Sequence, residues 1–284
     1  EQAIRAVEQA PDTDVAALAE KERSWQALLA SQAYEEQKLV ADAWCAAFLW
    51  PKDRPGPVAD AAPTTAVWRS LRDQEGQPPS VLVETTKKIA EQYALFHWDL
   101  AFPQVFARGG FDVVLGNPPW EHLELKEQEF FAEREPSIAN AQNAAARKKL
   151  IAAVRTSNPE LWRAYQDAKR MIDGETHFAR ASGRYPLCAK GRINTYALFA
   201  EHNWRLLNPH GRAGFIVPTG IATDDTTKEY FSTLAQHKRL VSVYDFENRK
   251  PYFRDVDARY RFCLFTIGVG SERAELVFFV HDVD

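Results

Sequence analysis

The sequence is poor in cysteine and methionine. Its three cysteines, Cys45, Cys188 and Cys263, lie far apart and form no Cys-x-x-Cys pair, which favours reduced, buried thiols over a disulfide framework. The seven histidines lack metal-ligand spacing as well, so we expect no metal site. Met171 is the only methionine, and the chain begins at Glu1 rather than at a starting methionine. We therefore expect a segment of a longer parent chain.

Long apolar runs and a charge excess of one sign are also missing. The chain has no run of about 18 apolar residues, which excludes a membrane-spanning helix. Residues 1–3 lack the basic-then-apolar pattern of a secretory signal, so we expect a cytoplasmic protein. The formal net charge is only −4, from 35 basic and 39 acidic residues. This balance is not typical of a protein that binds nucleic acid over its whole surface.

The basic residues are unevenly distributed along the chain. Residues 147–192 contain eleven basic and four acidic side chains. Such a stretch forms either a solvated helical face or a surface that contacts phosphates. The residues alone leave both interpretations open.

The length predicts one large or two small domains. A chain of 284 residues, 45% of them hydrophobic, buries a core without help from disulfides. Apolar side chains at three- and four-residue steps predict helices over residues 1–50. Four prolines between residues 51 and 66 predict a linker. We therefore divide the chain into a helical region with a Pro-rich linker, 1–66, and a second domain, 67–284.

The second domain alternates between helices and strands. Val113-Val114-Leu115, ended by Gly116, predicts a buried strand that stops at a turn. Residues 121–190 are polar and helical, which indicates an insertion. A helix capped by Asn194 follows. The later elements that we expect are strands over 213–218, 239–246, 260–268 and 275–280 and a helix over 224–236. This alternation predicts an α/β fold with parallel crossovers.

The turn Asn117-Pro118-Pro119-Trp120 directly follows the first predicted strand. Ligands of α/β sheets bind beyond the carboxyl ends of the strands. The prolines stiffen the backbone and donate no N–H, while the Asn117 side chain and the backbone carbonyls accept hydrogen bonds. Two convergent acceptors suit an exocyclic amino group, and Trp120 offers a face on which a planar base stacks. We interpret the turn as a site for adenine or cytosine rather than as a strand-ending turn with a core tryptophan.

The same residues carry a family resemblance. GNPPW, residues 116–120, resembles motif IV of the gamma-class DNA methyltransferases, which modify the N6 amino group of adenine. The segments NTYALF, LLNPHGRAGFIVPTG and VYDFENRKPYFRDVDARYRFCLFTIG resemble the later motifs of that family in order and spacing. The approach HWDLAFPQVF is similar to that of the large methylases of type II restriction–modification and of BREX- and DISARM-type phage defence. The resemblance covers roughly residues 90–270.

The resemblance implies a reaction and a cofactor. S-adenosylmethionine would be the methyl donor, and the acceptor would be an adenine extruded from double-stranded DNA. Asn117 and the Pro118 carbonyl would accept hydrogen bonds from the adenine amino group, in a catalytic turn completed by Pro119 and Trp120. The transfer would be a direct in-line attack without a covalent intermediate.

Other residues receive roles from the same resemblance. Trp120 would stack on one face of the extruded base, and Phe253 would pack on its other side. Phe199 would contact the cofactor together with Asn117. Each of these phenylalanines has an alternative interpretation as a core aromatic. Asp245 and Glu247 are interpreted as loop acceptors.

The basic stretch would then contact double-stranded DNA. The expected contacts come from six residues: Arg147, Lys148, Lys149, Arg184, Lys190 and Arg192. The resemblance also implies two kinds of protein partner, the rest of a longer parent chain and other restriction or defence subunits, and no membrane.

One part of the family pattern is missing. The gamma class has a glycine-rich cofactor loop upstream of motif IV, where the backbone approaches the cofactor closely. Residues 1–108 contain only Gly56 and Gly76, and we interpret residues 268–271 (Gly-Val-Gly-Ser) as a hairpin turn. The chain therefore predicts a partial Rossmann-like methyltransferase sheet, the catalytic half of the domain, with a helical N-terminal region and a helical insertion.

Several explanations of the missing loop stay open. The first half of the domain could lie upstream in the parent chain, or the chain could be a degenerate copy that binds DNA or serves as a scaffold. A third interpretation keeps the methyltransferase fold and changes the substrate to an RNA base or a protein glutamine.

Overall fold

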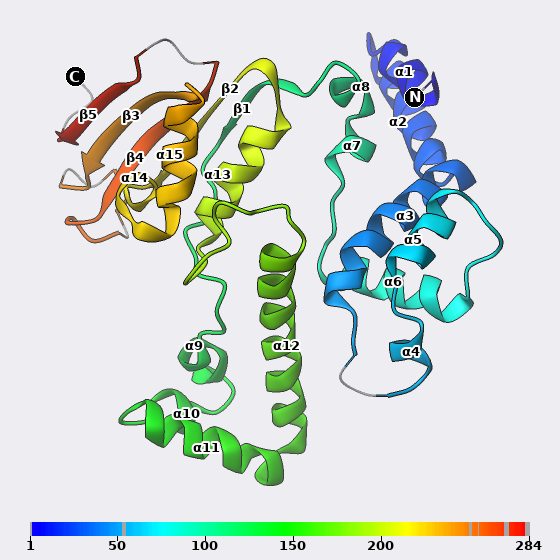
Figure 1. Ribbon diagram of the computed structural model, residues 1–284. Helices are drawn as coiled ribbons and strands as arrows, with labels where there is room; N and C mark the ends of the chain where they lie inside the picture. Colours follow the sequence, from blue (N-terminus) through cyan, green and yellow to red (C-terminus); the bar gives the residue numbers. More distant parts are fainter. Residues whose placement is uncertain (1, 53–54, 250–251, 255, 270–272, 282–284) are drawn as a thin grey trace.

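The structure is a computed structural model that describes residues 2–52, 55–249, 252–254, 256–269 and 273–281. It contains an N-terminal helical unit, a five-stranded sheet and a helical arm that extends away from the sheet (Figure 1). The helical unit comprises α1 (Gln2–Gln9), α2 (Val15–Leu29), α3 (Gln32–Leu49), α4 (Pro57–Asp60), α5 (Thr65–Arg72), α6 (Ser80–Gln92), α7 (Trp98–Ala101) and α8 (Pro103–Phe106). Helices were expected over residues 1–50, and α1 to α3 confirm them.

The core of the helical unit lies between α3 and α6. Ala46 and Leu49 on α3 pack with Leu82 and Ile89 on α6. Trp50 closes this core, and its Nε1 donates to the Val58 carbonyl over 2.6 Å. The Pro-rich segment that follows is thus anchored to the helical core, and it contains α4 and the start of α5.

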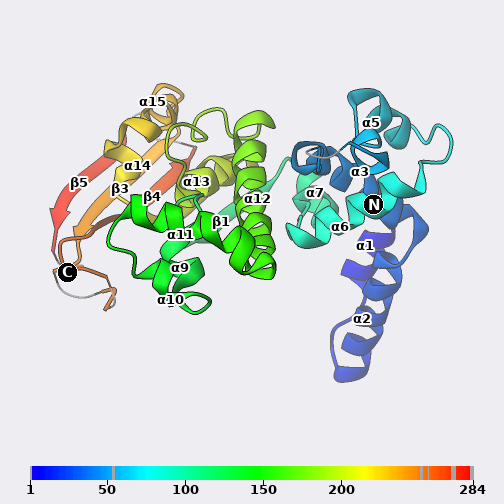
Figure 2. The same ribbon diagram turned by 90° about the horizontal axis from the view of Figure 1, so that it is seen from below.

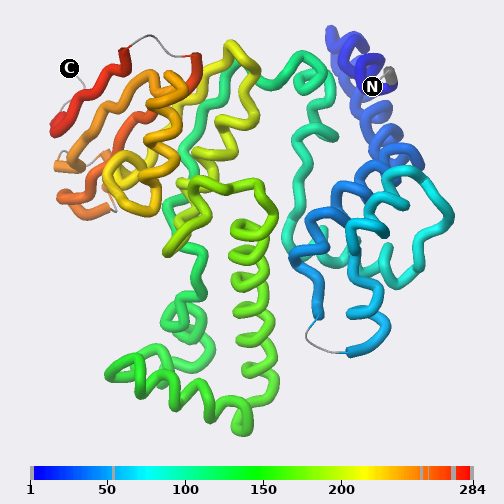
Figure 3. The backbone as a smooth tube through the Cα atoms, in the orientation of Figure 1, coloured from blue at the N-terminus to red at the C-terminus, as the bar shows by residue number. Residues whose placement is uncertain are grey.

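The arm is formed by α9 (Glu127–Ala132), α10 (Pro136–Ala139), α11 (Ala144–Ser157) and α12 (Pro159–Ala181). It has a core of its own, made by Phe131, Ile138, Ile151, Val154, Leu161 and Tyr165. The backbone trace shows α12 as a long rod between this core and the rest of the molecule (Figure 3). The predicted helical insertion is therefore a separately packed unit.

The base of α12 packs on the helical unit. Phe178 contacts Trp44 and Phe48 of α3 edge-to-face, with ring centroids 6.1 and 5.8 Å apart. One turn earlier, Gly174 lies against Tyr93, and a Cβ at this position would lie 2.6 Å from the Tyr93 hydroxyl. α12 therefore packs closely on the helical unit at Gly174, where a side chain would displace the Tyr93 ring.

The sheet has the strand order β1-β2-β4-β3-β5. β2 is parallel to β1, and β3 is parallel to β5, whereas β4 runs antiparallel between β2 and β3. The strands are β1 (Phe111–Gly116), β2 (Leu207–Pro218), β3 (Leu240–Glu247), β4 (Arg261–Gly268) and β5 (Glu275–Val280). The α/β fold class is confirmed, in the form of a mixed, Rossmann-like sheet.

The expectation of parallel crossovers throughout is wrong for β4. The described residues between β3 and β4 contain no helix, and a short helix-free connection joins antiparallel neighbours. The expected hairpin at residues 268–271 is wrong as well, because β4 and β5 are not neighbours in the sheet. Residues 270 and 271 of that segment lie outside the described part of the chain.

One face of the sheet is covered by α13 (Thr195–Leu206), α14 (Gly220–Thr223) and α15 (Lys228–Gln236), as Figure 2 shows from below. Tyr230 and Leu234 of α15 pack there against Phe215, Val243 and Phe265. The helix expected over residues 224–236 is therefore split into shorter pieces, with the 3₁₀ turn η1 (Asp225–Thr227) between α14 and α15.

The opposite face and one edge of the sheet are exposed. β1 lies at the edge, where Val113 is 60% and Leu115 78% exposed. Leu264 and Val277 also remain exposed. The prediction that the first strand is buried is thus wrong for the described residues, because only one neighbouring strand pairs with it.

The start of β1 depends on Gly110. Its φ of +124° lies in the left-handed region, and a Cβ at this position would lie 2.5 Å from the Leu206 carbonyl oxygen. Glycine alone permits this approach of β1 to the end of α13.

Within the described ranges, no helix combines the length and the apolar character needed to cross a membrane.

His202 on α13 makes stability depend on pH. Burial, and then the nearby cations Arg184 and Arg205, lower the pKa of His202 to about 4. Between pH 6.5 and 4 the unfolded chain therefore binds more protons than the folded chain, so stability falls as the pH falls. We expect His202→Gln to remove on the order of 2 kcal/mol of this loss. Urea unfolding at pH 7 and pH 4.5 measures it, with the exposed His210→Gln as the matched control.

Candidate active site

The strands β1, β2 and β3 run in the same direction, so their carboxyl ends lie at the same end of the sheet. The described residues that leave these ends, 117–121, 219–224, 248–249, 252–254 and 256–260, form the candidate site. At the end of β1, Asn117 is exposed and Pro118 is buried. Within the described part of the chain, neither the Asn117 side chain nor the Pro118 carbonyl has a hydrogen-bond partner. Both acceptors are therefore unpaired, and Asn117 is exposed to solvent.

The turn after β1 is held by the first residue of α13. The Thr195 hydroxyl donates to the Pro119 carbonyl over 2.7 Å and accepts from the Glu121 N–H at 3.2 Å. The Thr195 N–H donates to the Glu121 carbonyl over 2.8 Å. The Pro119 carbonyl is thus already occupied. The acceptors left in the turn are those that the resemblance assigns to an adenine amino group, Asn117 and the Pro118 carbonyl.

Asn194 places Thr195 by starting the helix. Its side chain accepts from the Tyr196 N–H over 3.2 Å, which confirms the predicted helix cap. An isolated antiparallel bridge also pairs Asn194 with His122. The start of α13 and the turn after β1 therefore form one hydrogen-bonded assembly.

Trp120 lies among two further aromatic rings. Its Nε1 donates to the Ile216 carbonyl over 3.3 Å. Phe253 meets the indole edge-on, with centroids 5.6 Å apart and an interplanar angle of 68°. Tyr260 lies parallel to it, at 5.7 Å and 8°. The structure thus brings Trp120 and Phe253 into contact, and it adds Tyr260.

Asn248 orders the loop that carries Phe253 and Tyr260. This side chain is fully buried. Its Nδ2 donates to the carbonyls of Phe253 and Val256, both over 2.9 Å, and its Oδ1 accepts from the Phe253 N–H over 3.1 Å. The Asn248 N–H donates to the Tyr260 carbonyl over 3.0 Å. A single buried amide therefore fixes both aromatic positions.

Asp245 is a buried strand residue rather than a loop acceptor. It is completely buried in β3, where it accepts from the Thr219 hydroxyl at 2.5 Å and from the Phe279 N–H at 3.2 Å, and it pairs with Arg261. These bonds join the end of β2 to the start of β4. Glu247, the other expected loop acceptor, is the last residue of β3 and pairs with Arg249 over 2.5 Å.

Phe199 lies on α13 and is 45% exposed. The alternative interpretation of Phe199 as a core residue is therefore wrong. Phe199 and Asn117 are the two residues that the resemblance assigns to the cofactor, and both are exposed. Residues 1–108 contain no glycine-rich loop. That part of the chain therefore lacks the glycines which the resemblance would place at the cofactor loop.

The six predicted DNA-contact residues do not form one patch. Lys148 and Lys149 are exposed on α11, next to the half-buried Arg147. Lys190 pairs with Glu229, and Arg192 with Glu124. Arg184 lies over the ring of Trp44, 4.7 Å from its centroid. Of the six residues, Lys148 and Lys149 on the arm are therefore the exposed cations with neither an acidic nor an aromatic partner among the described residues.

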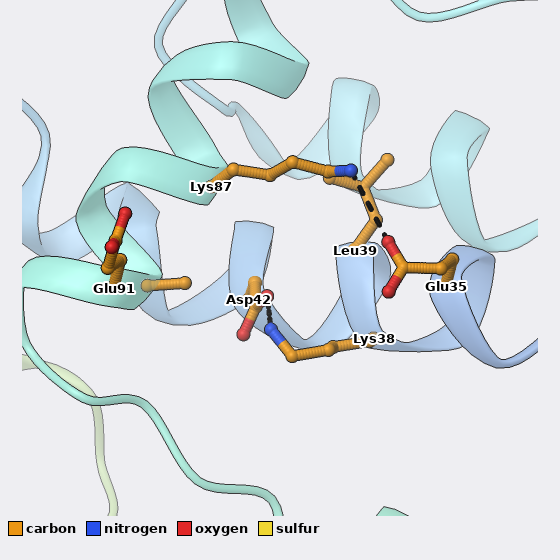
Figure 4. A pocket seen from close by; sticks show the side chains of 7 residues that line it. Glu35, Lys38, Leu39, Asp42, Lys87 and Glu91 are labelled. Atoms are coloured by element: carbon orange, nitrogen blue, oxygen red, sulfur yellow. Dashed lines mark hydrogen bonds and ion pairs between the residues drawn. The ribbon is translucent and has the colours of Figure 1, made fainter. Parts of the chain in front are cut away.

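A cavity of about 340 Å³ lies in the helical unit, between α3 and α6 (Figure 4). Four of its five charged side chains form two ion pairs across the lining. Lys38 donates to the buried Asp42 over 2.6 Å, and Lys87 contacts Glu35 at 3.3 Å. Among the described residues no group of His, Cys, Asp and Glu could hold a metal ion. This cavity contains none of the residues of the turn after β1.

A Rossmann-like sheet with this turn at the end of an edge strand defines a methyltransferase-type domain. The family model of the Eco57I restriction-modification methylases matches residues 52–153 and 164–253. The chain therefore belongs to the Eco57I restriction-modification methylase family, and this membership implies a methyltransferase. The matched residues include the turn 117–120 and end at Phe253. No curated protein matches the chain significantly.

Sequence reasoning missed three residues of the site: Thr195, Asn248 and Tyr260. Thr195 carries a local signal, because it follows a helix cap, but its bond to Pro119 spans 76 residues. Asn248 stands in a polar segment that resembles any surface loop. Four of the six residues before Tyr260 are charged, so the sequence suggests a solvent-exposed loop. Only the three-dimensional structure shows that Tyr260 contacts Trp120.

We expect Thr195→Val to weaken the turn after β1, because the Pro119 carbonyl and the Glu121 N–H lose their shared partner. The free energy of unfolding should fall by about 1 kcal/mol, and amide exchange at Glu121 should become faster. Thr195→Ser should restore both values. Thr233→Val, whose hydroxyl bonds only within its own helix, is the matched control, and an equal effect there would contradict the assignment.

We expect Asn248→Ala to lower the free energy of unfolding by about 2–3 kcal/mol, since buried backbone groups of the loop lose their partners. Trypsin should then cleave faster at the loop residues Arg249, Arg254 and Arg259. The control is Asn208→Ala. It removes a side-chain bond to Asp112, near the amino ends of β1 and β2 and away from the candidate site. Faster cleavage at the loop in this control would argue against a specific role of Asn248.

Proposed function

We propose that this chain is the base-binding and catalytic part of a DNA adenine methyltransferase of a restriction–modification or phage-defence system. The observation that carries the proposal is the pair of unpaired acceptors at the end of β1, Asn117 and the Pro118 carbonyl, beside the partly buried Trp120. Membership in a restriction-modification methylase family supports it. Extrusion of the base from the duplex would be needed, because the amino group of a stacked base is unreachable.

The residues of the chain would act on the adenine by position and charge. Asn117 and the Pro118 carbonyl would accept from the two N–H bonds of the amino group and orient its lone pair away from the turn. Thr195 keeps the Pro119 carbonyl occupied, so the amino group has one geometry available. Trp120 supplies the stacking surface, and Phe253 holds the indole from its edge.

S-adenosylmethionine is the cofactor that we propose, and it supplies the methyl group when bound. Phe199 and Asn117 are the residues of this chain that would contact it. The remaining contacts would come from the rest of a longer parent chain. The exposed edge of β1 and the uncovered sheet face, with Val113, Leu115 and Leu264 exposed, support such a partner, since exposed apolar side chains gathered on one face are typical of protein-binding surfaces.

Double-stranded DNA is the proposed nucleic-acid partner. Lys148 and Lys149 on α11 are the strongest of the predicted contacts, because they are exposed and reach solvent from the arm. Arg147 lies beside them. Arg184, Lys190 and Arg192 would first have to leave their present partners. Binding that depends on these cations should weaken steeply with salt.

The test combines cofactor binding, DNA binding and methyl transfer. We expect Asn117→Ala to lower tritium transfer from S-adenosylmethionine to unmethylated DNA at least about 100-fold and to leave DNA binding intact. The assay uses this chain alone and the longer parent chain that we propose. The control is Asn140→Ala, at an exposed position of the arm. Calorimetric titration of S-adenosylmethionine into both forms shows which one holds the complete cofactor site.

The same assay separates the competing functions. A non-catalytic DNA-binding copy would bind DNA and transfer no methyl group in either form. A methyltransferase that acts on RNA or on a protein glutamine would label those substrates and leave DNA unlabelled. Either result would overturn the proposal for adenine in DNA.

A further inference from the structure

The base-stacking face of Trp120 is covered by a residue of the chain itself. Tyr260 lies almost parallel to the indole, with an interplanar angle of 8° and centroids 5.7 Å apart. Phe253, the aromatic that the family resemblance singles out, stands at 68° and contacts the edge of the indole. A flat base needs a parallel face. Tyr260 therefore competes with a base for Trp120, and Phe253 does not.

The indole itself is held in place. Its Nε1 is bound to the Ile216 carbonyl, and the ring packs against the sheet core. Phe253 is in turn supported by Phe262, at 5.0 Å and 86°. Trp120 therefore cannot turn away to make room, and any rearrangement must come from Tyr260.

The backbone of Tyr260 is held by hydrogen bonds, so only its side chain can change conformation. Its carbonyl accepts from the Asn248 N–H, and its N–H donates to the Asp257 carbonyl over 2.9 Å, so the backbone is fixed next to β4. The side chain is 40% exposed, and no hydrogen bond of its hydroxyl is seen within the described residues. Rotation about the side-chain torsions takes the ring off Trp120 and into solvent without moving the strand.

We propose that Tyr260 is a placeholder in the base site: it stacks on Trp120 in the free protein and swings out when an extruded adenine takes its position. This inference rests on the proposed function of the turn after β1. The stack keeps the apolar face of Trp120 covered until DNA is bound. It also lowers the apparent affinity for a base, since the open arrangement is only a fraction of the population.

The experiment follows Trp120 by fluorine NMR in the chain labelled with 5-fluorotryptophan. Trp120→Phe identifies the resonance among those of the eight tryptophans. The variants are Tyr260→Ala, Tyr260→Phe and, as the matched control, Tyr252→Ala. Tyr252 is also 40% exposed and lies in the same loop, but its ring packs on Phe246 and Phe262. The probe is 2′-deoxyadenosine, with thymidine as the comparison ligand.

We expect Tyr260→Ala to shift the Trp120 resonance and to tighten deoxyadenosine binding about threefold to tenfold, the range that an aromatic pair contributes. Tyr260→Phe and Tyr252→Ala should behave like the unchanged chain. An unshifted resonance in Tyr260→Ala would show that the stack does not exist in solution. Equal or weaker binding in that variant would show that Tyr260 is no placeholder.

The outcomes also separate this inference from the proposed function. If deoxyadenosine perturbs Trp120 equally in all variants, the base site stands and the placeholder role is overturned. If it perturbs Trp120 in none of them, although the resonance shifts in Tyr260→Ala, the stack exists but is no base site. The proposed function then fails together with the placeholder role.

Discussion

The hydrogen bonds between residues 119–123 and 193–195 hold the candidate site together. Thr195 bonds to Pro119 and Glu121 on one side of this contact, and the Leu123 N–H donates to the Ile193 carbonyl over 3.1 Å on the other. The whole arm leaves the sheet and returns to it between these two segments. If this contact failed, the turn with Asn117 would become a flexible connection to the arm. Because of this contact, the turn keeps its geometry when the arm moves.

Much of the site could be predicted because its signals are local. The turn 117–120 follows a strand in sequence, and Asn194 caps the helix directly behind it, so neither required knowledge of distant residues. Phe253 was reached through the order of family motifs. Thr195, Asn248 and Tyr260 act across the fold, and their neighbours in sequence say nothing of their partners.

The sheet illustrates the same limit. An apolar, β-branched segment such as 113–115 predicts a strand, but its burial depends on how many strands and helices surround it. β1 has one strand beside it, and Val113 and Leu115 are exposed in consequence. The direction of β4 likewise depends on the length and conformation of the preceding loop. The same limit applies to the predicted DNA contacts. Three of the six basic residues chosen from the sequence contact Glu124, Glu229 or Trp44 in the folded chain.

The arm has a consequence for how the chain folds. β1 pairs in parallel with β2, and the residues between them include the entire arm. Closing so long a connection in one step would cost considerable chain entropy and slow the formation of the sheet. The arm has its own apolar core around Phe131 and Tyr165, so it can form first from contacts close in sequence. Once α12 is complete, its two ends have fixed positions, and the search that brings Thr195 to Pro119 is reduced to a short one.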